Sequence, residues 1–109
     1  MMKRETSDDL LAMQQRVQRF RYDRGWTETR NAKEIAISLL AEATELLDEF
    51  KWKSDADVDK HVVEGREAVV DEMMDVLYHI LWLAHDLNVD IPSEFERKMQ
   101  KNEKKYPVR

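Results

Sequence analysis

Apolar side chains recur every three or four residues along most of the chain, a spacing that is typical of amphipathic α-helices. The first helix is predicted over residues 7–22, with Ser7 or Asp8 as its N-cap. The second is predicted over residues 31–52, with Asn31 as its N-cap. The first half of the chain is therefore expected to form two amphipathic helices.

The second half predicts two more helices. The polar connection at residues 53–65 is expected to hold no more than a short helical turn, and the third helix to cover residues 66–87. From residue 76 to 84 this helix is apolar nearly all round, so it must be covered on every side, and we expect a second subunit to cover part of it. The fourth helix is predicted to start with Ser93 as N-cap and to be closed by Pro107.

The composition agrees with this pattern. Of the 109 residues, 42% are hydrophobic and 38% are charged, with only two Gly and two Pro. A chain of this length has room for one core, and a scarcity of turn residues is typical of helical proteins. We therefore expect an all-α fold, a four-helix bundle-like subunit that forms a homo-oligomer.

Several classes of function are disfavoured. The absence of cysteine excludes disulfides and thiolate metal sites, and the net charge of −5 provides no basic field for a nucleic acid. The N-terminus has no apolar signal-peptide core, and the longest apolar run is about half of a bilayer span. The expectation is a cytoplasmic protein with no nucleic-acid or membrane partner.

Two pairs of carboxylates stand out. Glu42 and Glu45 lie on the second predicted helix, and Glu72 and Asp75 lie on the third. Residues three apart share one helix face, and each pair borders the apolar stripe of its helix. If these helices pack antiparallel, the four carboxylates converge at the edge of the core.

Four converging carboxylates would repel one another unless a cation neutralised them. Oxygen ligands without cysteine suit Mg²⁺, Mn²⁺ or Ca²⁺. An ordinary solvated acidic face is the alternative, and the spacing leaves both interpretations open. A di-iron site is disfavoured because none of His61, His79 and His85 follows a glutamate by three residues.

Further segments resemble a known family in the same order along the chain. They are RGW at 24–26, RN at 30–31, EATELLDEFKWK at 42–53, DEMMDVLYHI at 71–80 and KMQKNEKKYPV at 98–108. Together with the acidic pairs, they resemble the all-α nucleoside triphosphate pyrophosphohydrolases of the MazG-like superfamily, in particular its short dCTP pyrophosphatase-like branch.

The resemblance implies that residues 1–109 form a single MazG-like domain, which assembles into a dimer or a dimer-of-dimers tetramer. The implied activity is hydrolysis of (deoxy)nucleoside triphosphates to monophosphate and pyrophosphate in nucleotide-pool house-cleaning, with dCTP or modified pyrimidine nucleotides among the substrates. Glu42, Glu45, Glu72 and Asp75 would bind Mg²⁺, with Mn²⁺ as the alternative ion. One of these four catalytic carboxylates would accept the proton of the attacking water. Glu45 is a candidate, and the sequence does not choose among the four.

The resemblance also implies substrate contacts near the C-terminus. Lys98, Asn102 and Lys105 would contact phosphates. Tyr106 would pack over the sugar or simply close the helix. Without the resemblance, the lysines and arginines near the C-terminus are best interpreted as compensating the negative end of a helix dipole.

Aromatic side chains are the implied contacts for the base. Trp52 would stack on it, with Trp26 or Phe20 as further walls, although Trp52 is equally well interpreted as a core or interface residue. Arg30 and Asn31 match positions near the nucleotide, and Asn31 is also explained as an N-cap.

The chain departs from the family pattern in places. The segment before Arg30 is shortened to TET at 27–29, which leaves base and sugar preference open. His79 stands where the family often has tyrosine, so it would hydrogen-bond either a ligand or a neighbouring acid. Asp48 and Glu49 are each open to an outer-shell or a surface role.

Two rival functions remain. The first is a non-catalytic helical oligomer that acts as a binding or interaction module. The second is a simple cation-binding bundle. Neither accounts for the four carboxylates together with Lys98, Asn102 and Trp52.

Overall fold

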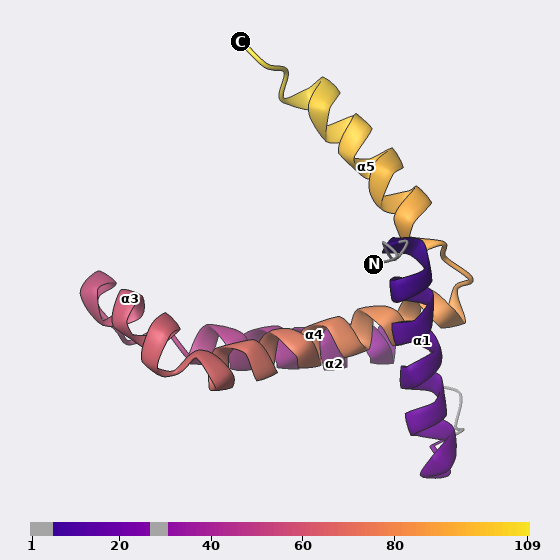
Figure 1. Cartoon of the computed structure of the whole chain (residues 1–109), viewed down its shortest axis with the longest axis horizontal. Helices are drawn as coiled ribbons and strands as arrows, with labels where there is room; N and C mark the ends of the chain where they lie inside the picture. The colour runs from indigo at the N-terminus through magenta and orange to yellow at the C-terminus, as the bar shows by residue number, and fades with distance from the viewer. Residues whose placement is uncertain (1–5, 27–30) are drawn as a thin grey trace, which may run out of the picture. The chain divides into compact units, whose positions relative to one another are not determined.

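The computed structural model describes residues 6–26 and 31–109 as a succession of α-helices. No strand occurs in these two ranges, so the predicted all-α class is confirmed. The helices, labelled in Figure 1, are α1 (Thr6–Asp23), α2 (Ala32–Asp48), α3 (Asp55–Glu64), α4 (Arg66–Asp86) and α5 (Ile91–Lys105).

The connection between α2 and α4 differs most from the prediction, because it forms the ten-residue helix α3 rather than a short turn. Its N-cap is Ser54, whose side chain accepts from the Asp57 N–H at 3.2 Å. Asp55 and Asp57 in the first turn stabilise the helix because their negative charges lie near the positive end of its dipole. No α3 residue is buried, and its few apolar side chains predict a helix only weakly.

Helix α2 ends at Asp48, earlier than the predicted end at residue 52. The backbone N–H groups of Phe50 and Lys51 both donate to the Leu47 carbonyl at 2.9 Å, which turns the chain toward α3. Phe50 continues the apolar spacing of α2 without being part of the helix. The prediction followed that spacing too far.

The start of α5 also corrects the prediction. Asp90, not Ser93, is the N-cap, and its carboxylate accepts from the Ser93 N–H at 3.3 Å. Pro92 is tolerated in the first turn because an N–H there would have no partner within the helix. In α1, which begins at Thr6, Ser7 and Asp8 likewise lie within the helix.

Helices α1 and α4 end in the same manner. The Gly25 N–H donates to Tyr22 O at 3.0 Å, and the Trp26 N–H donates to Arg21 O at 2.8 Å. This pair of bonds is a Schellman motif, which requires a left-handed residue, and Gly25 supplies it with φ 71°. Asn88, with φ 53°, closes α4 through the equivalent bonds.

The helices belong to two compact units, which are described separately. Helices α1 and α5 and the end of α4 from residue 84 form one unit, and α2, α3 and α4 up to residue 83 form the other. In the second unit, α2 and α4 run side by side in opposite directions (Figure 1), with Ile35 fully buried. The predicted single domain and the predicted oligomer stay predictions.

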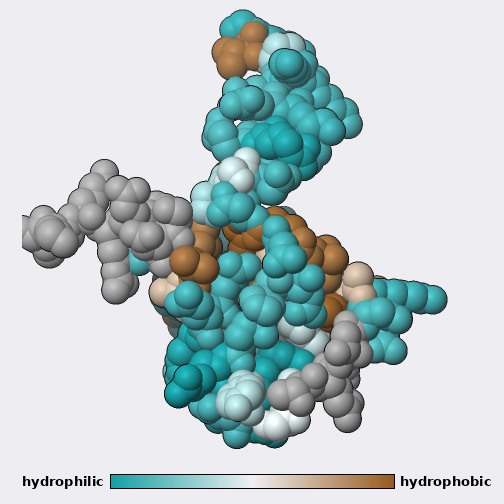
Figure 2. Space-filling view, turned by 90° about the vertical axis from the view of Figure 1, so that its right-hand side faces the viewer, coloured by the Kyte–Doolittle hydropathy of each residue, from teal (hydrophilic) through white to brown (hydrophobic). Residues whose placement is uncertain are grey.

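The buried apolar core is small for a chain of this length. In the part of the chain that the structure describes, its side chains are Val17, Ile35, Val69, Leu81, Trp82 and Ala84. Other large apolar side chains are exposed, and hydrophobic patches reach the surface among hydrophilic residues on the face drawn in Figure 2. Every helix within residues 6–26 and 31–109 is too short or too polar to cross a lipid bilayer.

Candidate metal centre

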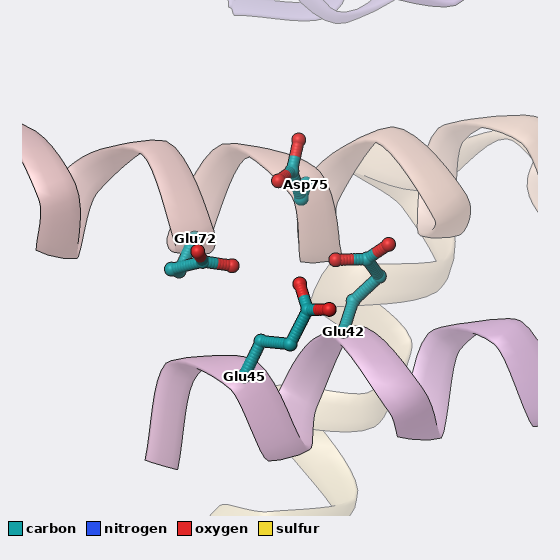
Figure 3. Close-up of side chains that lie close together, drawn as sticks. All are labelled: Glu42, Glu45, Glu72 and Asp75. Atoms are coloured by element: carbon teal, nitrogen blue, oxygen red, sulfur yellow. The ribbon is translucent and has the colours of Figure 1, made fainter. Parts of the chain in front are cut away.

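The antiparallel pair α2 and α4 brings two pairs of carboxylates together (Figure 3). Glu42 and Glu45 come from α2, and Glu72 and Asp75 come from α4. Each offers one oxygen, and these four oxygens all lie within 4.8 Å of one another. The spacing of three residues aims each pair from one helix face toward the other helix. The expected convergence is therefore present, and the metal-binding role of the four residues stays a prediction.

The close approach of like charges changes the protonation of two members. Burial is the main cause that raises the pKa of Glu42, and the Glu45 and Asp75 carboxylates raise it further, while His79 lowers it. The pKa of Glu72 is raised by the same causes, first burial and then the charges of Glu45 and Asp75. Both carboxyl groups thus lose their protons less readily than an isolated glutamate would.

Two oxygens of the cluster bear directly on whether a cation fits. Glu42 Oε2 and Glu72 Oε2 are closed to solvent, and no donor among the described residues hydrogen-bonds to either. A buried acceptor without a partner is costly. A hard divalent cation is the partner that a set of four carboxylates, in a chain without cysteine, accepts best. The residues therefore fit a metal ion of the Mg²⁺ type.

His79 lies beside the cluster, one helical turn after Asp75. Its Nδ1 donates to the backbone carbonyl of Asp75 at 2.9 Å. Because a carbonyl only accepts, this bond places the proton of the neutral ring on Nδ1 and leaves Nε2 as an acceptor. The ring also packs against Tyr78 and Trp82, at centroid distances of 5.2 and 6.0 Å. His79 is thus held by backbone and aromatic contacts, and its charge also acts on the Glu42 carboxyl group.

The acidic residues after Glu45 have other partners. Asp48 forms a salt bridge with Lys51 at 2.8 Å. Glu49 contacts the imidazole of His61 at 2.9 Å. Neither belongs to the group of four carboxylates. Each of the two residues thus has a partner outside the cluster, and an outer-shell role for either stays a prediction.

Trp52 is on the turn that follows α2, with 88% of its surface exposed. Lys51 Nζ lies 5.4 Å from the centre of its ring. This exposure excludes a core role for Trp52 within the subunit, and its stacking and interface roles stay predictions. Trp82 is the opposite case, since it is buried as the sequence predicted.

The candidate phosphate contacts lie on α5, in the other compact unit. Lys98, Asn102 and Lys105 are spaced to share one face of this helix. The side-chain amide of Asn102 donates to the Met99 sulfur at 4.0 Å. The backbone carbonyl of Asn102 accepts from the Tyr106 N–H at 2.8 Å. Tyr106 is therefore the C-cap of α5, and its proposed sugar contact stays a prediction.

The remaining predicted contacts lie at the ends of α1 and α2. Trp26 meets the edge of the Phe20 ring at a centroid distance of 5.6 Å, and the Arg24 guanidinium lies 3.7 Å from the centre of the Phe20 ring. Asn31 caps α2, because its side chain accepts from the Glu34 N–H at 3.0 Å. Arg30 lies outside the described residues.

Comparison with known proteins identifies the family. The sequence profile of the MazG-like family matches residues 35–109. The chain is 33% identical over 91 residues to dCTP pyrophosphatase 1 of Rattus norvegicus, covering 82% of this chain and 54% of that protein. The human protein of the same name is 31% identical over an equal span, with the same coverage. The chain thus belongs to the MazG-like family, and it spans about half the length of the curated relatives it matches.

A solved structure shares the fold over the whole chain. It is a pyrophosphatase from Archaeoglobus fulgidus DSM 4304, with a TM-score of 0.79 and 33% sequence identity. The match covers 99% of this chain and 98% of that one. The chain therefore shares its fold with a pyrophosphatase of similar length.

Proposed function

We propose that the protein hydrolyses nucleoside triphosphates to monophosphate and pyrophosphate, with Mg²⁺ held by the four carboxylates. The observation that carries this proposal is the convergence of Glu42, Glu45, Glu72 and Asp75 within 4.8 Å in a chain of the MazG-like family. The names of its relatives, dCTP pyrophosphatase 1 and a pyrophosphatase, support the reaction class.

A bound divalent cation would supply charge neutralisation for the triphosphate and a more acidic water for attack on the α-phosphorus. The four carboxylates differ in their exposure to solvent, and we propose roles for them on this basis. Glu42 and Glu72 are half-buried, and their unpartnered oxygens would hold the cation together with Glu45 and Asp75. Glu45 and Asp75 are exposed. Both are within reach of solvent, and of the two we propose Glu45 as the group that accepts the proton of the attacking water.

For the substrate, we propose deoxynucleotides, with dCTP or a modified pyrimidine nucleotide preferred. The name of the relatives, dCTP pyrophosphatase 1, supports this choice. Trp52 stacks on the base, which would cover an indole that otherwise faces water. Lys98, Asn102 and Lys105 contact the phosphates from one face of α5.

This proposal is tested by measuring pyrophosphate release from the four deoxynucleoside and four ribonucleoside triphosphates, with Mg²⁺, with Mn²⁺ and with a chelator. We expect release with either metal, none with the chelator, and the highest kcat/KM for a pyrimidine deoxynucleotide. If the protein released pyrophosphate from none of these eight nucleotides, the proposed activity would be wrong. The non-catalytic binding module would then be the better interpretation.

We also propose that the subunit forms a dimer or tetramer through the exposed apolar faces of α2 and α4. Ile37, Leu40 and Leu47 recur at helical spacing on α2 and are 56% exposed or more, and on α4 Met73 and Ile80 are 46% and 43% exposed. Leu40→Arg should therefore shift the protein toward monomer in light scattering after gel filtration, because a buried unpaired charge opposes association. Val108→Arg, at a fully exposed terminal residue, is the matched control. A monodisperse wild-type monomer at micromolar concentration would contradict the proposal.

A further inference from the structure

The turn that carries Trp52 is held by backbone hydrogen bonds. Besides the two bonds from Phe50 and Lys51 to the Leu47 carbonyl, the Lys53 N–H donates to Phe50 O at 2.9 Å. Trp52 itself is 88% exposed and has little packing of its own. The backbone of this turn therefore sets where the indole stands.

The imidazole of His61, on α3, contacts the start of this turn. His61 Nε2 lies 2.9 Å from Glu49 Oε1, and both side chains are 23% exposed. Because a carboxylate accepts, Nε2 carries the proton of this hydrogen bond. The same ring meets Phe50 edge-on at a centroid distance of 6.1 Å. His61 thus contacts two successive residues at the start of the turn.

Gly65, which joins α3 to α4, packs closely against the His61 ring. A Cβ at Gly65 would overlap the His61 imidazole. The φ of Gly65 is −101°, which an alanine adopts without strain, so the ring rather than the backbone excludes a side chain here. To make room, the imidazole would have to shift from its position against Glu49 and Phe50. His61 is therefore seated between the turn at the end of α2 and the start of α4.

We propose that His61 is a positioning residue of the nucleotide site: it locks the turn at residues 49–53 so that Trp52 is presented for stacking. This inference rests on the proposed role of Trp52 in binding the base. His61 touches no substrate. It acts through Glu49 and Phe50, and it reduces the conformational freedom that an exposed indole would otherwise lose on binding a nucleotide.

The first test measures the turn without any nucleotide. In His61→Ala, amide hydrogen exchange at residues 50–53 should accelerate about fivefold or more, since a hydrogen bond and a ring contact are lost. The indole ¹H–¹⁵N resonance of Trp52, assigned with Trp52→Phe, should shift. His61→Gln should restore most of the wild-type behaviour because its Nε2–H can still donate to Glu49. His85→Ala, at an exposed histidine of α4, is the matched control.

The second test uses dCTP hydrolysis. Trp52→Ala is expected to raise KM about tenfold, and His61→Ala about fivefold, each with kcat changed by about twofold or less. The double variant should be no worse than Trp52→Ala alone, because one residue acts through the other. A merely structural role for His61 would instead add to the effect of Trp52→Ala and lower kcat.

Gly65→Ala provides an independent check on the seat of the ring. It should raise KM and accelerate exchange as His61→Ala does, whereas in the His61→Ala background it should have no further effect, because the overlap is gone. If Gly65→Ala were equally harmful in both backgrounds, the inference would be wrong.

The outcomes separate this inference from the proposed function. An unchanged KM in Trp52→Ala would overturn the role of Trp52 and, with it, the role of His61 in binding. If Trp52→Ala raised KM while His61→Ala altered neither KM nor the Trp52 resonance, only the role of His61 would be overturned.

Discussion

Asp75→Asn and Glu45→Ala are each expected to lower kcat/KM for pyrophosphate release by about a hundredfold or more. Each change removes a negative charge from the group of four carboxylates that lie within 4.8 Å. Asp75→Asn preserves the size of the side chain, so its effect reports charge and metal binding rather than packing. The assay is steady-state pyrophosphate release with saturating Mg²⁺.

Asp59→Asn is the control for this prediction. It makes the same substitution at an exposed aspartate of α3, outside the cluster, and should retain wild-type kcat/KM. Circular dichroism should show that Asp75→Asn, Glu45→Ala and Asp59→Asn are all folded. Wild-type rates in Asp75→Asn and Glu45→Ala would refute the assignment of the metal site, even if the enzyme itself were active.

Mg²⁺ is expected to raise the unfolding temperature of the wild-type protein markedly at pH 7. At a concentration of one hundred times Kd, binding to the native state alone contributes about 2.7 kcal/mol, which corresponds to about 10 °C for a domain of this size. Glu42→Gln should be more stable than the wild type without metal, because it removes one of the repelling charges. It should also lose most of the response to Mg²⁺. Differential scanning fluorimetry with and without Mg²⁺ measures both effects.

The pH dependence gives this prediction a definite sign. The pKa of Glu42 is raised in the folded protein, so the native state binds its proton more tightly than the unfolded chain does. Its contribution to stability is therefore full below the ordinary value of 4.5 and is lost as pH rises through the raised pKa. The advantage of Glu42→Gln should accordingly be larger at pH 7 than at pH 5. An advantage that is equal at both values, or a metal response that survives the substitution, would contradict the model of four repelling ligands.

The carboxylate cluster could be predicted from the sequence because its geometry follows from local rules. Glu42 and Glu45, like Glu72 and Asp75, have the spacing that puts two residues on one helix face. Their position beside the apolar stripes tells which faces meet when α2 and α4 pack. Only the antiparallel direction had to be assumed, and a connection of fewer than twenty residues favours it.

Helix ends were predicted less well because they depend on competing signals. Phe50 continues the apolar spacing of α2, yet turn hydrogen bonds to Leu47 end the helix before it. At α5, both Asp90 and Ser93 are good N-caps, and the position of Pro92 decides between them only once the backbone path is known. Helix α3 buries no residue, and its few apolar side chains gave only a weak signal.

The contact between His61 and Glu49 could not be predicted because it joins residues twelve apart through the seating of α3. The sequence raised His61 only as a possible ligand of a di-iron site. Gly65 was the one hint, since a glycine after a histidine by four residues permits a close approach of the ring. That hint is visible only when the helix between them is known.

The small core described above has a thermodynamic consequence. Ile35 is the single side chain in the described part of the chain that is fully buried, while Leu40, Leu47 and Ile80 remain in contact with water. If a second copy covers these side chains, folding and association become one equilibrium. Dilution would then lower the unfolding temperature, so the stability of this protein would be a property of its concentration as much as of its sequence.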